Sequence, residues 1–210
     1  SIEPIAAGMP ALAEGLSMDG GKAAAEGIMT TDTRLKQIAL EFVIGDKKVR
    51  LGGMAKGSGM ISPNMATMLS FITTDVDIDA SLLQPLLKEV ADKTFNMISV
   101  DGDTSTNDTL TILANGKAEN PEITEDNEDF RKFLFALNKL NTIMAMKIAA
   151  DGEGASRLVE CTVSGAKDEE TARGLAKEVI GSDLVKAAMY GKDANCGRIL
   201  CAMGYSGFDF

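Results

Sequence analysis

The segment that most constrains the fold is QIALEFVIGDKKVRLGG, residues 37–53, because it predicts two neighbouring strands. Two apolar runs flank Gly45-Asp46, and a Gly/Asp pair in that position is typical of a hairpin turn. The next apolar run, TMLSFITTDVDI at 67–78, is nearly continuous, which is typical of a buried strand. A chain with these segments must build a sheet and cover it.

Helical patterns alternate with these strands. The clearest is DASLLQPLLKEVADKTF at 79–95, which is amphipathic and has Asp79 as a cap, and another helix is expected with Thr124 as its cap. Four further helices are expected at Ile5–Leu16, Gly21–Met29, Lys167–Ile180 and Asp183–Met189.

Further strands are expected on both sides of the polar turn within residues 96–116, at Arg157–Ala166 and after Arg198. Strands and helices in this order predict an α/β to α+β fold with layers of helices on mixed sheets.

Histidine is absent from the 210 residues, and this absence limits the available chemistry. It excludes Ser-His-Asp and Cys-His catalysis and the usual zinc sites, so no metal site is expected. A base would have to be a carboxylate, a lysine, a tyrosine or a free α-amine. The net charge of −10 argues against partners such as nucleic acid or anionic membranes.

The sequence is expected to belong in the cytoplasm. Its three cysteines, Cys161, Cys196 and Cys201, show no paired spacing, which suits a reducing compartment. The opening SIEPIAAGMP lacks the basic region and apolar core of a signal peptide. No stretch approaches the roughly 18 uninterrupted apolar residues of a membrane span.

Thr67 has two interpretations. It follows a small, flexible loop, MAKGSGMISPNMA, and directly precedes an apolar run, so it could simply begin a strand. Alternatively, cleavage between Ala66 and Thr67 would free an α-amine that activates the threonine hydroxyl as a nucleophile. Such an amine has a pKa near neutrality, as a general base requires. The residues alone leave both interpretations open.

Three glycine-rich or acidic motifs also have structural alternatives. Gly57-Ser58-Gly59 lacks the spacing of nucleotide-binding loops and is interpreted as a flexible loop. DGDTSTND at 101–108 fails the EF-hand pattern and is a polar turn that could line a site. Glu153 lies in a glycine-flanked turn and could hold an ammonium group or simply be solvated.

GKDANCGR at 191–198 carries Asp193, Asn195 and Arg198. The arginine could bind a carboxylate, or it could close a turn by pairing with a neighbouring acid.

Five motifs in order distinguish this sequence: IMTTDT, MAKGSGMISPNMATML, SVDGDTSTNDT, ADGEGAS and GKDANCGRIL. With them, the whole chain closely resembles the ornithine acetyltransferase family, the bifunctional glutamate N-acetyltransferases of arginine biosynthesis. The resemblance implies a layered sandwich of sheets between helices, of the autoprocessing N-terminal-threonine type. It also implies self-cleavage between Ala66 and Thr67, after which Thr67 carries an acetyl group from N-acetylornithine to glutamate in a ping-pong reaction.

The resemblance assigns residues to these roles. Thr67 is the nucleophile, while Thr30, Lys56 and Glu153 match substrate-binding positions. We expect Lys56 to face a substrate carboxylate and Glu153 an ammonium group. The products are ornithine and N-acetylglutamate, no cofactor is implied, and acetyl-CoA serves some members as donor.

The resemblance also implies boundaries. Residues 1–66 correspond to the C-terminal part of the α-subunit and residues 67–210 to the N-terminal part of the β-subunit, within one main structural domain. Subunits of the family assemble as homo-oligomers or heterotetramers. Its Thr-Gly oxyanion-hole pair and its C-terminal substrate-binding Asn and Thr have no counterpart in these residues, and Cys196 stands where members carry tryptophan.

Two rival functions remain from the sequence. An N-terminal-nucleophile amidase or peptidase would share Thr67 but use water as the acceptor. A catalytically silent fragment would bind amino acids without forming an acetyl-enzyme.

Overall fold

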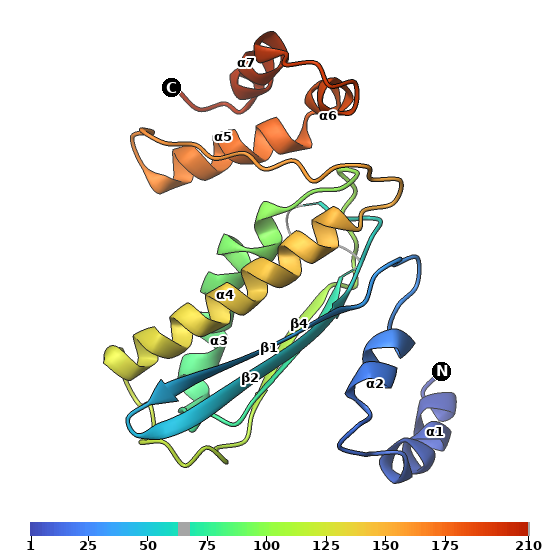
Figure 1. Cartoon of the computed structure of the whole chain (residues 1–210), viewed down its shortest axis with the longest axis vertical. Helices are drawn as coiled ribbons and strands as arrows, with labels where there is room; N and C mark the ends of the chain where they lie inside the picture. Colours follow the sequence, from blue (N-terminus) through green and yellow to red (C-terminus); the bar gives the residue numbers. More distant parts are fainter. Residues whose placement is uncertain (63–67, 210) are drawn as a thin grey trace.

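The protein is described here by a computed structural model that covers residues 1–62 and 68–209 (Figure 1). The predicted hairpin is present: β1 (Lys36–Ile44) pairs antiparallel with β2 (Lys47–Lys56), and Ile44 lies opposite Lys47. Gly45 in the turn has a φ of 59°, a conformation that glycine adopts without steric cost.

The sheet continues from the hairpin to two more strands. β3 (Leu69–Thr74) runs antiparallel to β2, and β4 (Thr109–Ala114) runs parallel to β3, which gives the order β1-β2-β3-β4. Over the described ranges the chain thus forms one mixed sheet with flanking helices, and the predicted α/β class is confirmed.

Two helices cover one face of this sheet (Figure 1). α3 (Ala80–Lys93), capped by Asp79 as predicted, connects the parallel strands β3 and β4 and is followed by the short 3-10 helix η1 (Phe95–Met97). α4 (Glu128–Ala150) packs on β1 and β2 and against α3. Their apolar faces meet the sheet in a core that includes Leu51, Ile72, Val90, Leu137 and Met144.

β1 shows which face is covered. Ile38, Leu40 and Phe42 pack against the core, whereas Ala39 and Glu41 between them are exposed. This alternation is the period of two that a strand imposes on its side chains. The side chain of Lys36 lies on the same covered face and is only 1% exposed, which is unusual for a lysine.

The other α-helices of the described residues lie outside this core (Figure 1). α1 (Glu3–Glu14) and α2 (Gly21–Gly27) precede the sheet, and α1 has no buried residue. α5 (Glu169–Gly181), α6 (Asp183–Tyr190) and α7 (Cys196–Tyr205) pack on one another around Val179, Val185 and Ala202. No helix in 1–62 or 68–209 combines the length and apolar character needed to cross a membrane.

Two strands predicted in the C-terminal part of the chain were wrong. Arg157–Ala166 has the alternation of a strand but forms none, because no other segment of the described chain pairs with it. The apolar residues after Arg198 form α7 instead, since Asn195 caps that helix by accepting from the Arg198 N–H.

One helix cap and a third predicted strand also differ from the structure. Asn127, not Thr124, caps α4, because its side chain accepts from the Phe130 N–H. Before the polar turn, Ile98 is extended, but the segment from Phe95 forms η1 rather than a strand.

Candidate functional site

The predicted substrate-binding residues come from three separate parts of the chain. Thr30 precedes β1, Lys56 ends β2, and Glu153 follows α4. Lys56 is 7% exposed, whereas Thr30 and Glu153 are exposed. The predicted cleavage site and nucleophile, Ala66 and Thr67, lie outside the described residues.

The turn after Lys56 is fastened to the loops that carry the other two candidates. Gly57 donates its N–H to Asp32 Oδ1 at 2.7 Å, and the Ser58 and Thr31 hydroxyl groups are 2.6 Å apart. Glu153 donates its own N–H to the Ser58 carbonyl oxygen at 2.8 Å. These contacts bring the loops of Thr30, Lys56 and Glu153 together at one end of the sheet.

The Glu153 side chain lies directly against Gly59. A Cβ atom on Gly59 would stand 2.6 Å from Glu153 Oε1, closer than two unbonded atoms can approach. Because Gly59 has no side chain, it leaves room for the Glu153 carboxylate beside the turn.

The acidic turn at 101–108 holds the chain on both sides of residues 63–67. The Asp101 carboxylate accepts from the N–H groups of Met60, at 2.6 Å, and Ile61, at 3.0 Å. Asp108 Oδ1 accepts from the Met68 N–H at 2.8 Å. The acids of this motif therefore bind backbone N–H groups, as its structural interpretation predicted, whereas a role in lining a site stays a prediction.

Asp108 is also electrostatically unusual. Burial raises the pKa of its carboxyl group, while the hydrogen bond from Met68 and the charge of Lys56 act in the opposite direction. Its Oδ2 atom is buried and has no hydrogen-bond partner among the described residues. This oxygen belongs to the carboxylate that binds the Met68 N–H, and it can accept a further hydrogen bond.

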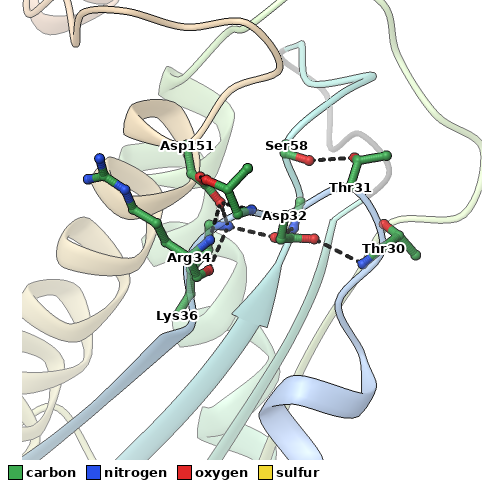
Figure 2. A network of polar contacts seen from close by, with 9 residues as sticks. Thr30, Thr31, Asp32, Arg34, Lys36, Ser58 and Asp151 are labelled. Carbon is green, nitrogen blue, oxygen red and sulfur yellow. Dashed lines mark hydrogen bonds and ion pairs between the residues drawn. The ribbon is translucent and has the colours of Figure 1, made fainter.

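Next to Gly57, in the turn after Lys56, lies an ion cluster formed by Lys36, Asp32 and Asp151 (Figure 2). Lys36 Nζ lies 2.6 Å from Asp32 Oδ1 and 2.6 Å from Asp151 Oδ2. The three side chains are 1%, 0% and 2% exposed, respectively. Paired charges at this depth are held in one geometry.

Each carboxylate of the ion cluster also binds backbone. Asp32 accepts from the N–H groups of Thr30, at 3.2 Å, and Gly57. Asp151 accepts from Thr33 N at 3.0 Å, from Arg34 N at 3.1 Å and from the Thr33 hydroxyl. The ion cluster therefore connects the loop of Thr30, the end of β2 and the end of α4.

The same contacts lower both pKa values. Burial alone would raise the pKa of Asp151, but hydrogen bonds from Lys36, Thr33 and Arg34 outweigh it and lower the pKa to about 2. Asp32 behaves alike: burial opposes ionisation, and bonds from Gly57, Lys36 and Thr30 lower its pKa overall. Both carboxylates are charged at neutral pH, so the ion cluster carries one excess negative charge.

The ion cluster was not predicted from the sequence. Asp32 and Asp151 stand within the motifs IMTTDT and ADGEGAS, each two positions from a predicted substrate-binding residue, Thr30 or Glu153. The sequence signal for the ion cluster was the position of Lys36. It lies on the same face of its strand as the core residues Ile38 and Leu40. A lysine in phase with a buried face requires a partner, and that requirement points to the aspartates.

GKDANCGR has a structural role, but not through the predicted pairing of Arg198 with an acid: among the described residues the arginine binds a carbonyl oxygen instead. Arg198 donates to the Leu184 carbonyl oxygen at 2.9 Å, and Asn195 caps α7 and bonds Asp193 at 3.0 Å. The motif joins α6 to α7 and does not contribute to the ion cluster.

A cavity of about 450 Å³ lies next to Glu153, between α4, α6 and the segment 153–161. Its lining includes Glu153 but neither Thr30 nor Lys56. Within the described ranges, no group of three or more His, Cys, Asp or Glu side chains is arranged to hold a metal ion.

Comparison with known proteins decides the family. The model of the ArgJ family matches residues 1–210. The chain belongs to the ArgJ family. This confirms the family resemblance drawn from the five motifs.

Individual ArgJ relatives agree with this assignment. The arginine biosynthesis bifunctional protein ArgJ of Symbiobacterium thermophilum is 53% identical over 209 residues, which are 100% of this chain and 52% of that protein. The Listeria monocytogenes protein of the same name is 56% identical over 185 residues, which are 88% of this chain and 46% of that protein. The chain spans about half the length of both relatives.

A solved structure supports the fold. The crystal structure of the arginine biosynthesis bifunctional protein ArgJ from Bacillus halodurans matches with a TM-score of 0.66 and 51% identity. The match covers 68% of this chain and 67% of that one.

Proposed function

We propose that the protein carrying this chain transfers an acetyl group from N2-acetylornithine to glutamate in arginine biosynthesis, in the cytoplasm. The observation that carries this proposal is the match to the ArgJ family over all 210 residues. Its relatives are named bifunctional proteins of arginine biosynthesis. The convergence of the loops of Thr30, Lys56 and Glu153 at one end of the sheet supports a shared substrate site.

The proposed nucleophile is Thr67. In the processing step, its hydroxyl oxygen attacks the Ala66 carbonyl carbon and the Ala66–Thr67 C–N bond breaks, which leaves an ester and a free Thr67 α-amine. Water then hydrolyses the ester, which releases the Ala66 carboxylate and regenerates the Thr67 hydroxyl. In the first half-reaction the hydroxyl attacks the acetyl carbonyl carbon. The α-amine takes the hydroxyl proton and passes it to the departing ornithine nitrogen.

The second half-reaction reverses this path with a different amine. The glutamate nitrogen attacks the acetyl-Thr67 ester and forms the new amide bond, and the proton it loses returns to the threonine oxygen. N-acetylglutamate leaves, and acetyl-CoA is a candidate alternative donor for the first half-reaction.

Charge gives the substrate-binding residues their proposed roles. Lys56 is buried, so its ammonium group would be a strong partner for a substrate carboxylate. Glu153 is exposed beside Gly59, where its carboxylate would accept hydrogen bonds from the substrate ammonium group.

Cleavage would divide the chain into residues 1–66, part of an α-subunit, and residues 67–210, part of a β-subunit. We propose that β2 and β3 remain paired after cleavage, because Lys56–Leu69 and the neighbouring register pairs hold them together. Assembly of the two subunits into larger oligomers is part of the same proposal.

Denaturing mass spectrometry of the full natural protein tests the proposal. Two fragments that meet at Ala66 and Thr67 are expected, and a Thr67→Ala variant should remain a single chain. One uncleaved species in the natural protein would contradict the mechanism, because Thr67 would then have no free amine.

Acetyl transfer from labelled N-acetylornithine, with and without glutamate, separates the rival functions. Transfer that requires glutamate supports the proposal, whereas release of acetate without glutamate would indicate an amidase. Amino-acid binding with no acetyl-Thr67 would indicate a silent protein. Labelled acetyl-CoA in a parallel assay tests the alternative donor.

A further inference from the structure

We infer that Lys36 is a positioning residue for amino-acid binding, acting through the ion cluster that it forms with Asp32 and Asp151. The inference rests on the proposed function and adds residues to which that function assigned no role. Lys36 is the link between two carboxylates that belong to different loops of the candidate site. It does not itself need to touch the substrate.

One half of the ion cluster controls the loops of Thr30 and Lys56. Asp32 accepts from the N–H group of Thr30 at 3.2 Å and from that of Gly57, the residue after Lys56, at 2.7 Å. These two bonds fix the backbone at or next to two of the three substrate-binding candidates. The Lys36 ammonium group, 2.6 Å away, fixes the Asp32 carboxylate in turn.

The other half controls the loop of Glu153. Asp151 is the C-terminal cap residue of α4 and lies two positions before Glu153. It is held by Lys36 at 2.6 Å and by the N–H groups of Thr33 and Arg34. From this fixed point the chain reaches Ser58, whose carbonyl oxygen accepts from the Glu153 N–H.

The burial of the ion cluster argues for positioning beyond stability. The side chains are at most 2% exposed, and in proteins well-packed apolar residues often join segments as stably as buried charges do. The charged groups add directional hydrogen bonds, because each carboxylate oxygen accepts from donors whose positions are fixed. A buried, satisfied polar network of this kind holds a unique arrangement.

The test compares Lys36→Met with Lys132→Met in the full natural protein. Lys132 is a matched control, because it too contacts two carboxylates, Glu128 and Asp129 at 3.1 Å each, but on the surface of α4. We expect Lys36→Met to raise KM for both N-acetylornithine and glutamate at least tenfold in fully folded enzyme. Lys132→Met should leave KM within twofold of the natural value.

A purely structural role predicts a different result. Lys36→Met would then lower the unfolding midpoint and the fraction of active molecules, while KM of the folded molecules stayed unchanged. That outcome would overturn the inference.

A second variant covers the case in which Lys36→Met does not fold. Asp32→Asn/Lys36→Met keeps the excess charge of the ion cluster at −1, and the amide oxygen of the introduced asparagine can still accept from Gly57, but the link to Asp151 is lost. A folded double variant with raised KM supports positioning, and one with unchanged KM overturns it. If the natural protein neither transfers acetyl groups nor binds amino acids, the proposed function fails as well. If the natural protein is active and the KM values of these variants are unchanged, the inference about Lys36 fails but the proposed function stands.

Discussion

Glu153 donates its backbone N–H to the carbonyl oxygen of Ser58 at 2.8 Å, and this bond holds its carboxylate against Gly59. A methyl group at Gly59 would stand 2.6 Å from Oε1 and would push the carboxylate aside. The atoms that would move are those of the carboxylate at the end of the flexible, exposed Glu153 side chain, so the loss of folding stability should be small.

Gly59→Ala should therefore weaken amino-acid binding several-fold while the free energy of unfolding changes by less than about 1 kcal/mol. Titration calorimetry and urea unfolding measure the two effects. Gly204→Ala is the matched control, because a Cβ there meets no atom within 4 Å. Equal binding by both variants would show that the position of the carboxylate does not matter.

Glu153→Gln tests the charge of the same side chain. A hydrogen bond between charged groups contributes about 1.5–3 kcal/mol, so loss of the carboxylate charge should raise KM roughly tenfold or more. Stability should hardly change, because the side chain is exposed. Steady-state kinetics measure KM, with Glu122→Gln as the control because Glu122 is also exposed. An unchanged KM in Glu153→Gln would rule out the ammonium-binding role.

The elements predictable from sequence were those with a strong local signal. The Gly45-Asp46 hairpin, the capped helix α3 and the helices α5 and α6 follow from turn residues and periodicity over short distances. Arg157–Ala166 shows the limit of this approach, because alternation describes a strand only if another strand pairs with it.

The site was predictable in part for a similar reason. Motifs pointed to Thr30, Lys56 and Glu153, but not to the contacts that bring their loops together. Those contacts join Asp32 to Gly57 and Lys36 to Asp151, which is 115 positions away from Lys36 along the chain. No local sequence pattern predicts a contact between residues so far apart. The one sequence signal was that Lys36 falls on the core-facing side of β1.

Asp108→Ala and Asp108→Asn should differ in their effect on self-cleavage. Asp108 Oδ1 accepts from the N–H of Met68, the residue after Thr67. An asparagine oxygen can still accept that bond, whereas alanine leaves the N–H without its acceptor at a cost of about 1 kcal/mol or more. We expect slower cleavage in Asp108→Ala, measured by denaturing mass spectrometry over time, and near-natural cleavage in Asp108→Asn. Equal cleavage in all three proteins would show that this bond does not position the cleavage site.

The pH dependence of Asp108 has a definite sign. Burial raises the pKa of the folded carboxyl group, so its favourable contribution exists at low pH and is lost as pH rises through that pKa. Relative to Asp108→Asn, the natural protein should therefore lose stability as the pH rises from the acid range toward neutrality. Urea unfolding of both proteins across that range measures the difference, and the opposite slope would contradict the burial argument.

Asp151 should stabilise the fold with the opposite pH dependence. Its pKa is lowered from 3.8 to about 2, so the folded state binds the proton less tightly than the unfolded chain. The contribution is therefore complete above pH 3.8 and is lost as the pH falls through about 2. A shift of this size corresponds to about 2.5 kcal/mol at neutral pH.

Urea unfolding of the natural protein and Asp151→Asn at several pH values measures this contribution. The difference in unfolding free energy between the two proteins should be largest at neutral pH and should shrink below pH 3.8, because asparagine does not titrate. Taking the difference at each pH removes the contribution of every acid that the two proteins share. A difference that stays constant from pH 7 to about pH 2 would show that Asp151 acts through hydrogen-bond geometry alone and not through its charge beside Lys36.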